Sequence, residues 1–520
     1  MPAFRGDDRV QRRFVLVPGS DFGLDALAAL EGAGARTLPW EEAVRRHHDL
    51  VLAASPKGEL QLLDGPLVLL PHGAGFNKAL RDGGSADSAS GLDATHLIRD
   101  GRPLARLHAL AHPHQIDRIA ARSPEAARRG VVVGDPTLDR LLASTGRRDR
   151  YREAFGTGGR RLVVLTSTWG PESLIRRRPG LAAELAALLP YDDWQLGLVV
   201  HANVFSEDGA YDLRERLAPA FASGAVLARP YEEWGALLVA ADAVVTDHGS
   251  TALYAAALGR PVLAACDGGR EVVPGSPMAG LLRGAPRFTG ADDLPVLEEA
   301  VRDGRAGERA RRFAAAAFDR QGEALERLRH ELYRLLGLEP PDRAPAEAEP
   351  LPVPVPSPAV TAPAAFAVRV RADGPVVVVA RHPPGADVPL HHLAAEADLA
   401  ATRQRESAAL LYRRTAPEEG ADEWAARTLK EFPGCRTAAV VVSRERCFVR
   451  RDDGAAYDVR VERREPGPLP DPAAVLSAVH VRLEREPGGG ELECAVGGRR
   501  VAVRVTPDSA GGPPPPSPAP

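Results

Sequence analysis

Residues 241–263 read ADAVVTDHGSTALYAAALGRPVL, and this stretch decides the fold class. A short β-branched run, Ala243–Thr246, is followed by a polar turn and then by an Ala/Leu-rich run that fits a helix over Thr251–Leu258. Gly259 is placed to end that helix, and Pro261 opens the next apolar run. The stretch therefore predicts a strand, a helix and a second strand, the repeating unit of a parallel α/β sheet.

The same alternation of short strand-like runs with helical runs extends from Arg13 to about Leu336. It predicts two parallel-sheet lobes in tandem, a double-Rossmann arrangement, with the break near Arg147–Arg160. The strands predicted for the first lobe are Phe14–Val17, Asp49–Ala53, Pro66–Leu70, Thr95–Ile98, Arg106–Ala109 and Gly130–Val133. Those predicted for the second lobe are Arg161–Leu165, Gln195–Val200, Ala225–Ala228, Ala243–Thr246 and Pro261–Ala264, with helices such as Leu181–Leu189 and Glu232–Ala240 between them.

Composition divides the whole chain into segments of different character. These are a loose polar N-terminus at 1–13, a first Rossmann-like lobe at 14–150, a second at 151–338, a Pro/Ala-rich linker at 339–365, an α+β domain at 366–506 and a tail at 507–520. The second lobe is expected to close with a long helical tract, Asp292–Leu336, that ends at Gly337. The linker should be extended and the tail disordered, because such Pro-rich segments do not build a packed core.

The α+β domain is predicted to combine short strands with two helices. The predicted strands are FAVRVRA (366–372), PVVVVA (375–380), TAAVVVS (437–443), RCFVRR (446–451), HVRLERE (480–486), ELECAV (491–496) and RVAVRV (500–505). The helices are expected near 390–413 and 420–432. Nothing in this domain points to a chemistry, and a role in binding a protein partner is a hypothesis.

Composition also excludes several classes of function. The chain has 520 residues and a formal net charge of −4, so it lacks the basic stripe of a nucleic-acid-binding protein. Its four cysteines form no C-x-x-C pair, which favours a reducing cytoplasm over a disulfide or zinc framework. No apolar run approaches the ~20 residues that a membrane-spanning helix needs. The expected location is therefore the cytoplasm, and attachment to the inner face of a membrane is compatible with it.

In open α/β sheets, ligands bind beyond the carboxyl ends of the strands, so polar residues there are the first candidates for a site. The cluster after Ala243–Thr246 consists of Asp247, His248, Gly249, Ser250 and Thr251. Gly249 permits a tight turn, Ser250 is placed to cap the helix, and the first helical amides are expected to face the gap between the lobes. With the positive end of the helix, they predict an anion site for a pyrophosphate. The alternative is that Ser250 only caps the helix and Asp247 only braces the turn.

Two other strand ends of the second lobe carry candidates. His201 directly follows the strand in LGLVVHANVF (196–205), where an imidazole can donate to a phosphate or ribose oxygen. Thr168 follows the strand in RLVVLTSTWGPESL (161–174), where its hydroxyl would face a ligand. The alternatives are a structural role for His201 and a packing role for the neighbouring Trp169.

The first lobe offers the segment LVLLPHGAGFNK (67–78). His72 and Gly73 follow a predicted strand, and Gly73 allows a ligand to approach the backbone closely. His72 could remove the proton of an acceptor hydroxyl as a general base, and Lys78 could neutralise a phosphate. The alternative is a glycine-rich loop with a surface histidine.

The remaining histidine pairs, His47–His48, His112–His114 and His391–His392, lack a metal-ligand pattern with a carboxylate partner. We expect these pairs to be surface or structural residues, and we expect no metal site. The chain contains no Walker A loop, no G-x-S-x-G and no kinase signature, so those chemistries are excluded.

The order of these segments resembles the CDP-glycerol glycerophosphotransferase family, the teichoic-acid-type polymerases and primases of the two-lobed GT-B class. The likeness covers roughly residues 66–265 and does not reach the C-terminal domain. The UDP-N-acetylglucosamine 2-epimerases, which are related nucleotide-sugar enzymes, share part of the pattern. The positions that match the family's motifs are His72, Gly73 and Lys78 in HG…K, Thr168 and Trp169 in P-T-W, His201 and Asn203 in H-P-N, and Thr246, Asp247 and Ser250 in T-D-Y-S-S.

The chain also departs from these motifs. Ser167 replaces the proline of P-T-W, Ala202 replaces the proline of H-P-N, and His248 and Gly249 stand at the two middle places of T-D-Y-S-S. The turn expected at the lobe junction is matched only loosely, by Gly134, Pro136 and Asp139. The groups nearest the phosphates are therefore changed, and the resemblance leaves the donor and the acceptor open.

The resemblance implies a transferase that moves a glycerophosphate or glycosyl group from a nucleotide-diphosphate donor to an acceptor hydroxyl. In that role His72 would be the base, while His201, Ser250 and nearby amides would hold the donor pyrophosphate. The donor would be CDP- or UDP-linked, and the acceptor a membrane lipid or polymer of a bacterial cell envelope. No cofactor and no metal is expected, since the chain has no D-x-D motif and a helix dipole with side chains can stabilise the leaving diphosphate.

Two other functions stay open at the level of sequence. The motif substitutions are compatible with a non-catalytic nucleotide-binding or scaffold protein whose C-terminal domain recruits partners. A nucleotide-sugar epimerase or hydrolase on the same fold ranks third, because it needs carboxylates around the sugar and the crevice motifs offer mainly Asp135, Glu172 and Asp247.

Overall fold

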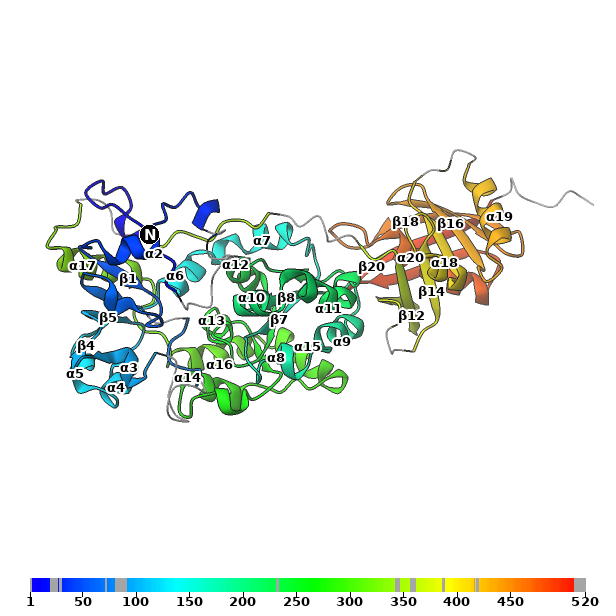
Figure 1. Cartoon of the computed structure of the whole chain (residues 1–520). Coiled ribbons are helices and arrows are strands. Elements are labelled where there is room, and N and C mark those ends of the chain that lie inside the picture. Colours follow the sequence, from blue (N-terminus) through cyan, green and yellow to red (C-terminus); the bar gives the residue numbers. More distant parts are fainter. Residues whose placement is uncertain are drawn as a thin grey trace, which may run out of the picture.

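The computed structural model describes residues 2–18, 27, 30–70, 73–79, 91–230, 233–341, 347–355, 362–385, 389–415, 417 and 420–508. Within these residues the chain forms two α/β lobes and a nine-stranded domain beyond the second lobe (Figure 1). The expected α/β class with parallel sheets is confirmed in both lobes. His72 and all but the first two residues of the predicted tail lie outside the described residues.

The first lobe is built on a four-stranded parallel sheet in the order β1-β2-β5-β6. Its strands are β1 (Val51–Ala53), β2 (Leu67–Leu69), β5 (Leu107–Leu110) and β6 (Gly130–Val132), each close to a predicted strand. The helices of this part of the chain are α2 (Trp40–Val44), α3 (Ala94–Leu97), α4 (His114–Ala120), α5 (Pro124–Ala127) and α6 (Pro136–Ala143).

Two strands predicted for the first lobe are wrong. Phe14 forms only an isolated bridge with Thr37 instead of a strand. Residues 95–97 belong to α3, because the amides of His96 and Leu97 donate to the Asp93 carbonyl and close a helical turn. Only the last residue of that prediction enters a strand, the two-residue β3 (Ile98–Arg99), which pairs with β4 (Arg102–Pro103).

The second lobe is a five-stranded parallel sheet in the order β11-β10-β7-β8-β9. Its strands are β7 (Arg161–Ser167), β8 (Trp194–Val200), β9 (Val226–Leu227), β10 (Ala243–Thr246) and β11 (Val262–Ala264). The chain runs outward from β7 to β9 and then returns to place β10 on the other side of β7. The strand order therefore reverses between β7 and β10, the position at which open α/β sheets bind ligands.

Helices surround this second sheet, as the sequence predicts. They are α7 (Arg148–Ala154), α8 (Leu174–Arg177), α9 (Leu181–Leu188), α10 (Ala202–Asp208), α11 (Ala210–Ala222), α12 (Glu233–Ala240), α13 (Thr251–Ala257), α14 (Pro277–Gly284), α15 (Leu294–Arg302) and α16 (Gly304–Ala314). Both α12 and α13 are buried along most of their length, which fits their all-round apolar sequences.

The long helical tract predicted at 292–336 is three separate helices, and the last one returns to the first lobe. This helix, α17 (Ala324–Leu336), ends at Gly337, whose φ of +64° provides the expected left-handed stop. Its buried stripe, which includes Leu328 and Leu332, packs with Phe4 and Val68 of the first lobe. This helix, which the sequence analysis assigned to the second lobe, thus packs into the core of the first lobe.

Leu351 anchors the linker in a buried cluster. Leu351 is only 5% exposed and belongs to the same buried cluster as α12 and α13. Its amide donates to Ser144 Oγ (2.9 Å) and its carbonyl accepts from the Tyr151 hydroxyl (2.7 Å). An extended, Pro-rich segment can therefore be held in place without a core of its own.

The C-terminal domain is a closed nine-stranded barrel around a buried helix, α20 (Pro472–Arg485). The strand order around the barrel is β12-β13-β19-β20-β18-β17-β16-β15-β14, and β14 closes on β12. The strands are β12 (Ala365–Asp373), β13 (Val376–His382), β14 (His392–Glu396), β15 (Leu410–Arg413), β16 (Thr437–Val441), β17 (Arg446–Arg451), β18 (Ala456–Arg463), β19 (Gly490–Val496) and β20 (Arg499–Pro507). The sequence predicted an α+β domain with separate strands, and the structure adds that these strands close into a barrel.

Two predictions within this domain are wrong. Residues 480–485 of the predicted strand HVRLERE (480–486) belong to α20. The buried Val481 and Leu483 alternate there with the more exposed Arg482 and Glu484, which imitates the period of a strand. The helix expected near 390–413 is instead β14, the short α18 (Thr402–Ser407) and β15. The second predicted helix is confirmed as α19 (Ala421–Glu431).

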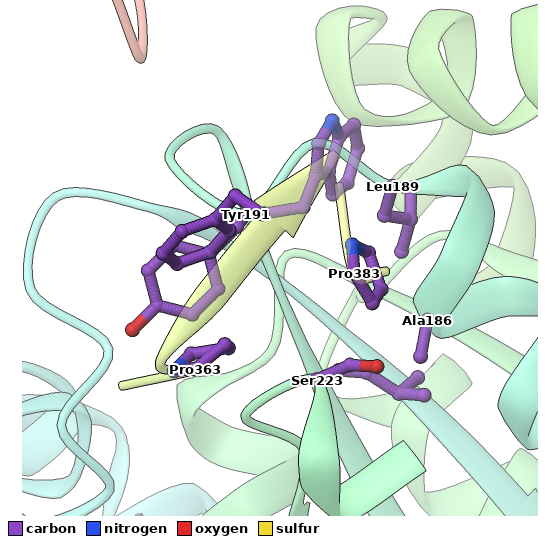
Figure 2. Close-up of a pocket in the computed structure, with 9 residues that line it drawn as sticks. Ala186, Leu189, Tyr191, Ser223, Pro363 and Pro383 are labelled. Carbon is purple, nitrogen blue, oxygen red and sulfur yellow. The ribbon is translucent and has the colours of Figure 1, made fainter. Parts of the chain in front are cut away.

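The barrel is attached to the second lobe through buried charges. The Arg381 guanidinium donates to both carboxylate oxygens of Asp192 (2.8 and 2.7 Å) and lies 2.9 Å from Asp471 in the barrel. Figure 2 shows the adjoining cavity, where Tyr191, Leu189 and Ala186 of the second lobe face Pro363 and Pro383 of the C-terminal part of the chain. Its volume of ≈ 10 Å³ holds about one water molecule, so this space is an imperfection of the interface rather than a substrate site.

Candidate functional site

The loops at the carboxyl edges of the two parallel sheets contact each other where the lobes meet. Gly73, after β2, has a φ of +61°, and a Cβ atom built on it would lie 2.6 Å from Ser250 Oγ after β10. Further along the same loop, Ala79 N–H donates to the Glu271 carbonyl (2.8 Å) and Val273 N–H donates to the Asn77 carbonyl (2.9 Å). The predicted glycine loop of the first lobe therefore lies against the predicted polar turn of the second.

Asp247 braces the point where the strand order reverses. Its Oδ2 accepts from Thr168 N–H (2.8 Å) and Leu174 N–H (2.9 Å), and its Oδ1 accepts from Gly249 N–H (2.9 Å). The residue has no exposed surface. These contacts join the end of β7 to the end of β10, so Asp247 shapes the site and has no oxygen turned toward a ligand.

The next two residues of the turn, His248 and Gly249, are also closely packed within the protein. His248 is 3% exposed, and its Nε2 lies 2.9 Å from Glu271 Oε2. Gly249 does not have a left-handed backbone, but a Cβ on it would lie 3.1 Å from Thr168 Cβ and 3.2 Å from Asp247 Oδ1. Glycine is therefore needed here for close packing, where the sequence suggested a tight turn.

Ser250 and Thr251 are the half-exposed members of the turn. The expectation that Ser250 caps α13 is wrong, because its backbone is itself helical (φ −54°, ψ −26°) and its side chain makes no cap hydrogen bond. The amides of Ala252 and Leu253 already donate to the carbonyls of Gly249 and Ser250 (both 3.0 Å). An anion at this point would therefore have to rely on the two hydroxyl groups more than on those amides.

His201 caps the helix that follows β8. Its Nδ1 accepts from Asn203 N–H (3.1 Å), so the proton of the neutral ring lies on Nε2. The ring lies 6.2 Å from the Trp169 ring, centroid to centroid, at the end of the neighbouring strand β7. Asn203 is 4% exposed, and its Oδ1 has no hydrogen-bond partner among the described residues.

Lys78 crosses the gap and enters a buried charge cluster of the second lobe. Its Nζ lies 3.2 Å from Glu271 Oε2, contacts the Trp169 carbonyl and sits 3.9 Å from the centroid of the Trp169 ring. Burial lowers the pKa of Lys78, while Glu271 opposes that shift. Although burial alone would raise the pKa of Glu271, hydrogen bonding from His248 and the charge of Lys78 bring it below its usual value.

Glu271 is the member of this site that the sequence analysis missed. It accepts from His248, Lys78 and the amide of Glu172 (3.2 Å), and so it connects both lobes. It follows β11 by a few residues, at the same carboxyl edge as the other candidates. Applying the strand-end rule to β11 as well would have found it.

The loosely matched motif at the lobe junction has a structural role. Asp135 caps α6 and accepts from the Tyr254 hydroxyl (2.9 Å), and Asp139 accepts from the amides of Gly322 (2.6 Å) and Ala324 (2.8 Å) at the start of α17. Burial raises the pKa of Asp135 to about 6. Asp135 therefore joins α6 to α13, and Asp139 joins α6 to the start of α17. Neither carboxylate faces the candidate site.

Within the part of the chain that the structure describes, no group of three or more His, Cys, Asp or Glu side chains is arranged to hold a metal ion. Over the same residues, none of the helices combines the length and the apolar composition needed to cross a bilayer. The role expected for His72 cannot be placed, since that residue lies outside the described residues. The structure thus brings Gly73, Lys78, Thr168, His201 and the 247–251 turn to the facing edges of the lobes.

Comparison with known proteins yields similarities of structure. No protein-family model and no curated protein matches the chain. Its structure is similar to that of the wall teichoic acid polymerase TagF, at 13% identity and a TM-score of 0.42, covering 58% of this chain and 78% of that one. It is also similar to UDP-GlcNAc 2-epimerase from Neisseria meningitidis bound to UDP-GlcNAc, at 16% identity and a TM-score of 0.35, covering 59% of this chain and 79% of that one.

A third similar structure is Anabaena HepE in complex with UDP and glucose, at 16% identity and a TM-score of 0.37, covering 62% of this chain and 91% of that one. At these identities and scores the similarities do not assign an activity. A teichoic acid polymerase, the kind of protein that the order of the sequence motifs resembles, is thus among the similar structures.

Proposed function

We propose that the two lobes form a transferase that moves a glycerophosphate or glycosyl group from a nucleotide-diphosphate donor to an acceptor hydroxyl. The observation that carries the proposal is the contact of Gly73 with Ser250, which sets the glycine loop of the first lobe against the strand-order reversal of the second. Ligands of open α/β sheets bind at such a reversal. A donor held there would present its transferable group to the first lobe.

The donor diphosphate is proposed to lie along the ends of β7, β8 and β10. Ser250 and Thr251 are half-exposed and carry hydroxyl groups, and the half-exposed His201 ring lies at the end of β8 beside them. Asp247, His248 and Gly249 would fix the shape of the turn through contacts within the protein and would not bind the donor themselves. Hydrogen-bond donors fixed in advance stabilise the charge of the leaving nucleotide without rearrangement.

The acceptor would react from the first-lobe side. Its hydroxyl oxygen forms the new bond to the phosphorus or sugar carbon of the donor, the bond to the nucleotide breaks, and the nucleotide leaves with that electron pair. The hydroxyl proton goes to a base, for which the sequence resemblance nominates His72. Substitution of His72 by Ala in a folded protein should abolish transfer while the donor still binds, and full activity of that variant would remove His72 from the mechanism.

A thermal-shift panel of CDP-glycerol, CDP-ribitol, UDP-sugars and GDP-sugars tests the proposal. A ligand of the native state raises its stability by about 2.7 kcal/mol at a hundredfold excess over Kd, which is readily visible. The shift should shrink in Ser250→Ala and His201→Ala but not in His330→Asn, a control at an exposed position of α17. Absence of a shift with every nucleotide would refute the proposed donor site.

A non-catalytic nucleotide-binding protein is the second candidate, and one observation favours it. Lys78 is paired with Glu271, and His248 is buried against the same carboxylate, so two polar groups of the family-like motifs are occupied within the protein. Nucleotide binding without release of product from any donor would support this function. The epimerase is not proposed, because Asp247, Asp135 and Glu271 already accept hydrogen bonds from the protein itself.

A further inference from the structure

A pair of histidines, His112 and His114, lies at the carboxyl edge of the first lobe and is not used by the donor site. The strand β5 ends at Leu110, and α4 begins at His114. In the sheet, β5 lies between β2 and β6, and the segments after both neighbours contact the second lobe, through Gly73 and through Asp135. The segment after β5 therefore lies at the same crevice.

Local contacts fix this segment beside the glycine loop. Gln115 is fully buried, and its side-chain oxygen accepts from Ala111 N–H (2.9 Å) while its amide nitrogen donates to the Ala74 carbonyl (3.4 Å). The Ala111 carbonyl accepts from Asp319 N–H (2.8 Å), which lies in the segment that connects α16 of the second lobe to α17. Ala74 and Ala111 both belong to the buried cluster that contains α13. The histidine pair thus lies between the glycine loop and the segment that connects α16 to α17.

The hydrogen bonds within the pair define its protons. The backbone N–H of His114 donates to His112 Nδ1 (3.2 Å), so this nitrogen is an acceptor. The two Nδ1 atoms are 2.7 Å apart, which requires His114 Nδ1 to carry the hydrogen and donate it. In the neutral pair, His112 therefore has Nε2–H and His114 has a lone pair on Nε2.

The pair is uncharged at neutral pH. Burial lowers the pKa of His112, and burial together with the charge of His112 lowers the pKa of His114 to about 4. The rings are half-exposed, and their centroids are 4.7 Å apart. A neutral pair with one donor and one acceptor side by side matches hydroxyl groups, which both donate and accept. The charges nearest the pair are those of Arg118 and Asp117 beside His114 and of Asp319 beside His112.

We propose that His112 and His114 form the subsite that binds the hydroxyl groups of the acceptor, and that this acceptor is a polyol or sugar. Nε2–H of His112 donates to one hydroxyl oxygen, and Nε2 of His114 accepts the hydrogen of a hydroxyl. The assignment rests on the proposed transferase function, because it gives the first lobe the acceptor. It adds the chemical class of the acceptor and the residues that orient it.

Asparagine variants separate this role from a structural one. In His112→Asn and His114→Asn the amide takes the place of the Nδ1 position, so the hydrogen bond between the two residues is kept while the outward nitrogen is lost. In His112→Gln and His114→Gln the amide instead takes the place of Nε2. The proposal predicts that the Asn variants lose acceptor binding at an unchanged melting temperature and that the Gln variants retain part of it.

The test is a titration of the full chain, labelled with ¹⁵N-histidine, with glycerol as the probe. We expect the wild-type spectrum to show an Nε2–H tautomer for His112 and an Nδ1–H tautomer for His114, and both Nε2 signals should move to saturation. In either Asn variant the glycerol affinity, read on the remaining histidine of the pair, should fall at least tenfold, whereas the control His330→Asn should leave it unchanged.

Two results would overturn the inference: signals of His112 and His114 that do not respond to glycerol, or Asn variants that bind glycerol like the wild type. Because the titration needs no nucleotide, its outcome is independent of the thermal-shift panel. A nucleotide that binds while glycerol does not would leave the transferase proposal standing without this subsite. Glycerol binding without any nucleotide binding would keep the polyol subsite and remove the donor site.

Discussion

The second lobe meets its two neighbours through different chemistry. Toward the barrel, Arg381 is 1% exposed and lies between the carboxylates of Asp192 and Asp471. Toward the carboxyl edge of the first lobe, the contacts are a glycine against Ser250, a short backbone pairing and the ion pair of Lys78 with Glu271. Breaking a buried ion pair is costly, and both interfaces have one. Arg381 faces two carboxylates, whereas Lys78 shares the single carboxylate of Glu271 with His248. The interface with the barrel therefore depends on one cation between two carboxylates, and the interface with the first lobe on one shared carboxylate with backbone pairs beside it.

Removing the buried cation should have the largest effect. Arg381→Ala leaves Asp192 and Asp471 without their shared partner, and such a loss costs about 3–5 kcal/mol. Urea unfolding should show this loss as an early transition of the barrel. Arg413→Ala, which removes a more exposed ion pair with Asp398, is the control and should cost at most about 1 kcal/mol. Equal effects of the two variants would mean that the barrel is not held by its buried charges.

Removing the buried side chain of Leu351, which anchors the linker, should have the second-largest effect on stability. Leu351→Ala empties a buried position against α12, and a buried Leu→Ala change costs about 2–5 kcal/mol. Limited proteolysis should cut the 347–355 segment faster in this variant, and the melting temperature should fall. Val355→Ala is the matched control, because Val355 is 69% exposed and should change neither quantity.

The junction carboxylate predicts a dependence of stability on pH. The pKa of Asp135 is raised by burial to about 6 from an unfolded value near 3.8. Between these values the folded protein keeps a proton that the unfolded chain has lost, so stability should fall as the pH rises through this window and level off above it, by up to about 1.4 kcal/mol per pH unit. The difference in urea midpoint between the wild type and Asp135→Asn, measured from pH 4 to 7, should carry this slope, because buried histidines with lowered pKa, such as His108 and His114, act with the opposite sign in both proteins. An unchanged slope in the variant would assign it to other groups.

The ion pair at the crevice should give the smallest effect on stability. Glu271→Gln removes the charge facing Lys78 and His248, and we expect a loss of about 1–3 kcal/mol because the hydrogen bonds involved are charge-assisted. Hydrogen exchange should speed up at residues 77–79 and 271–273, which pair across the lobes, and not in the barrel. Faster exchange in the barrel would contradict the view that the two interfaces are independent.

The two regions also differ in how well their sequences predict them. The unit at 241–263 was predicted almost to the residue, because β10 is a buried β-branched strand followed by glycine-containing turns and an Ala-rich helix. In the barrel, the end of α20 reads as a strand because the buried Val481 and Leu483 alternate with the more exposed Arg482 and Glu484. Asp471 and Pro472, at the cap and the first helical position, were the signals that could have identified it.

Within the candidate site, the sequence predicted which loops meet but not what each side chain does. The strand-end rule located Gly73, Thr168, His201 and the turn after β10. The rule could not reveal that the carboxylate of Asp247 accepts hydrogen bonds from backbone amides such as that of Thr168, or that Lys78 pairs with Glu271. These contacts join residues that are far apart in the sequence. The pair His112–His114 was dismissed for lack of a metal pattern, although its place after β5 follows from the same rule.

Hydrogen exchange of the full chain with and without CDP-glycerol, repeated with a UDP-sugar, tests the central claim most directly. The account predicts that one of these donors slows exchange at the ends of β7, β8 and β10, in residues 168–169, 201–203 and 247–251, and leaves the barrel unchanged. Protection confined to the barrel or to the interface around Arg381, or no protection with either donor, would contradict it.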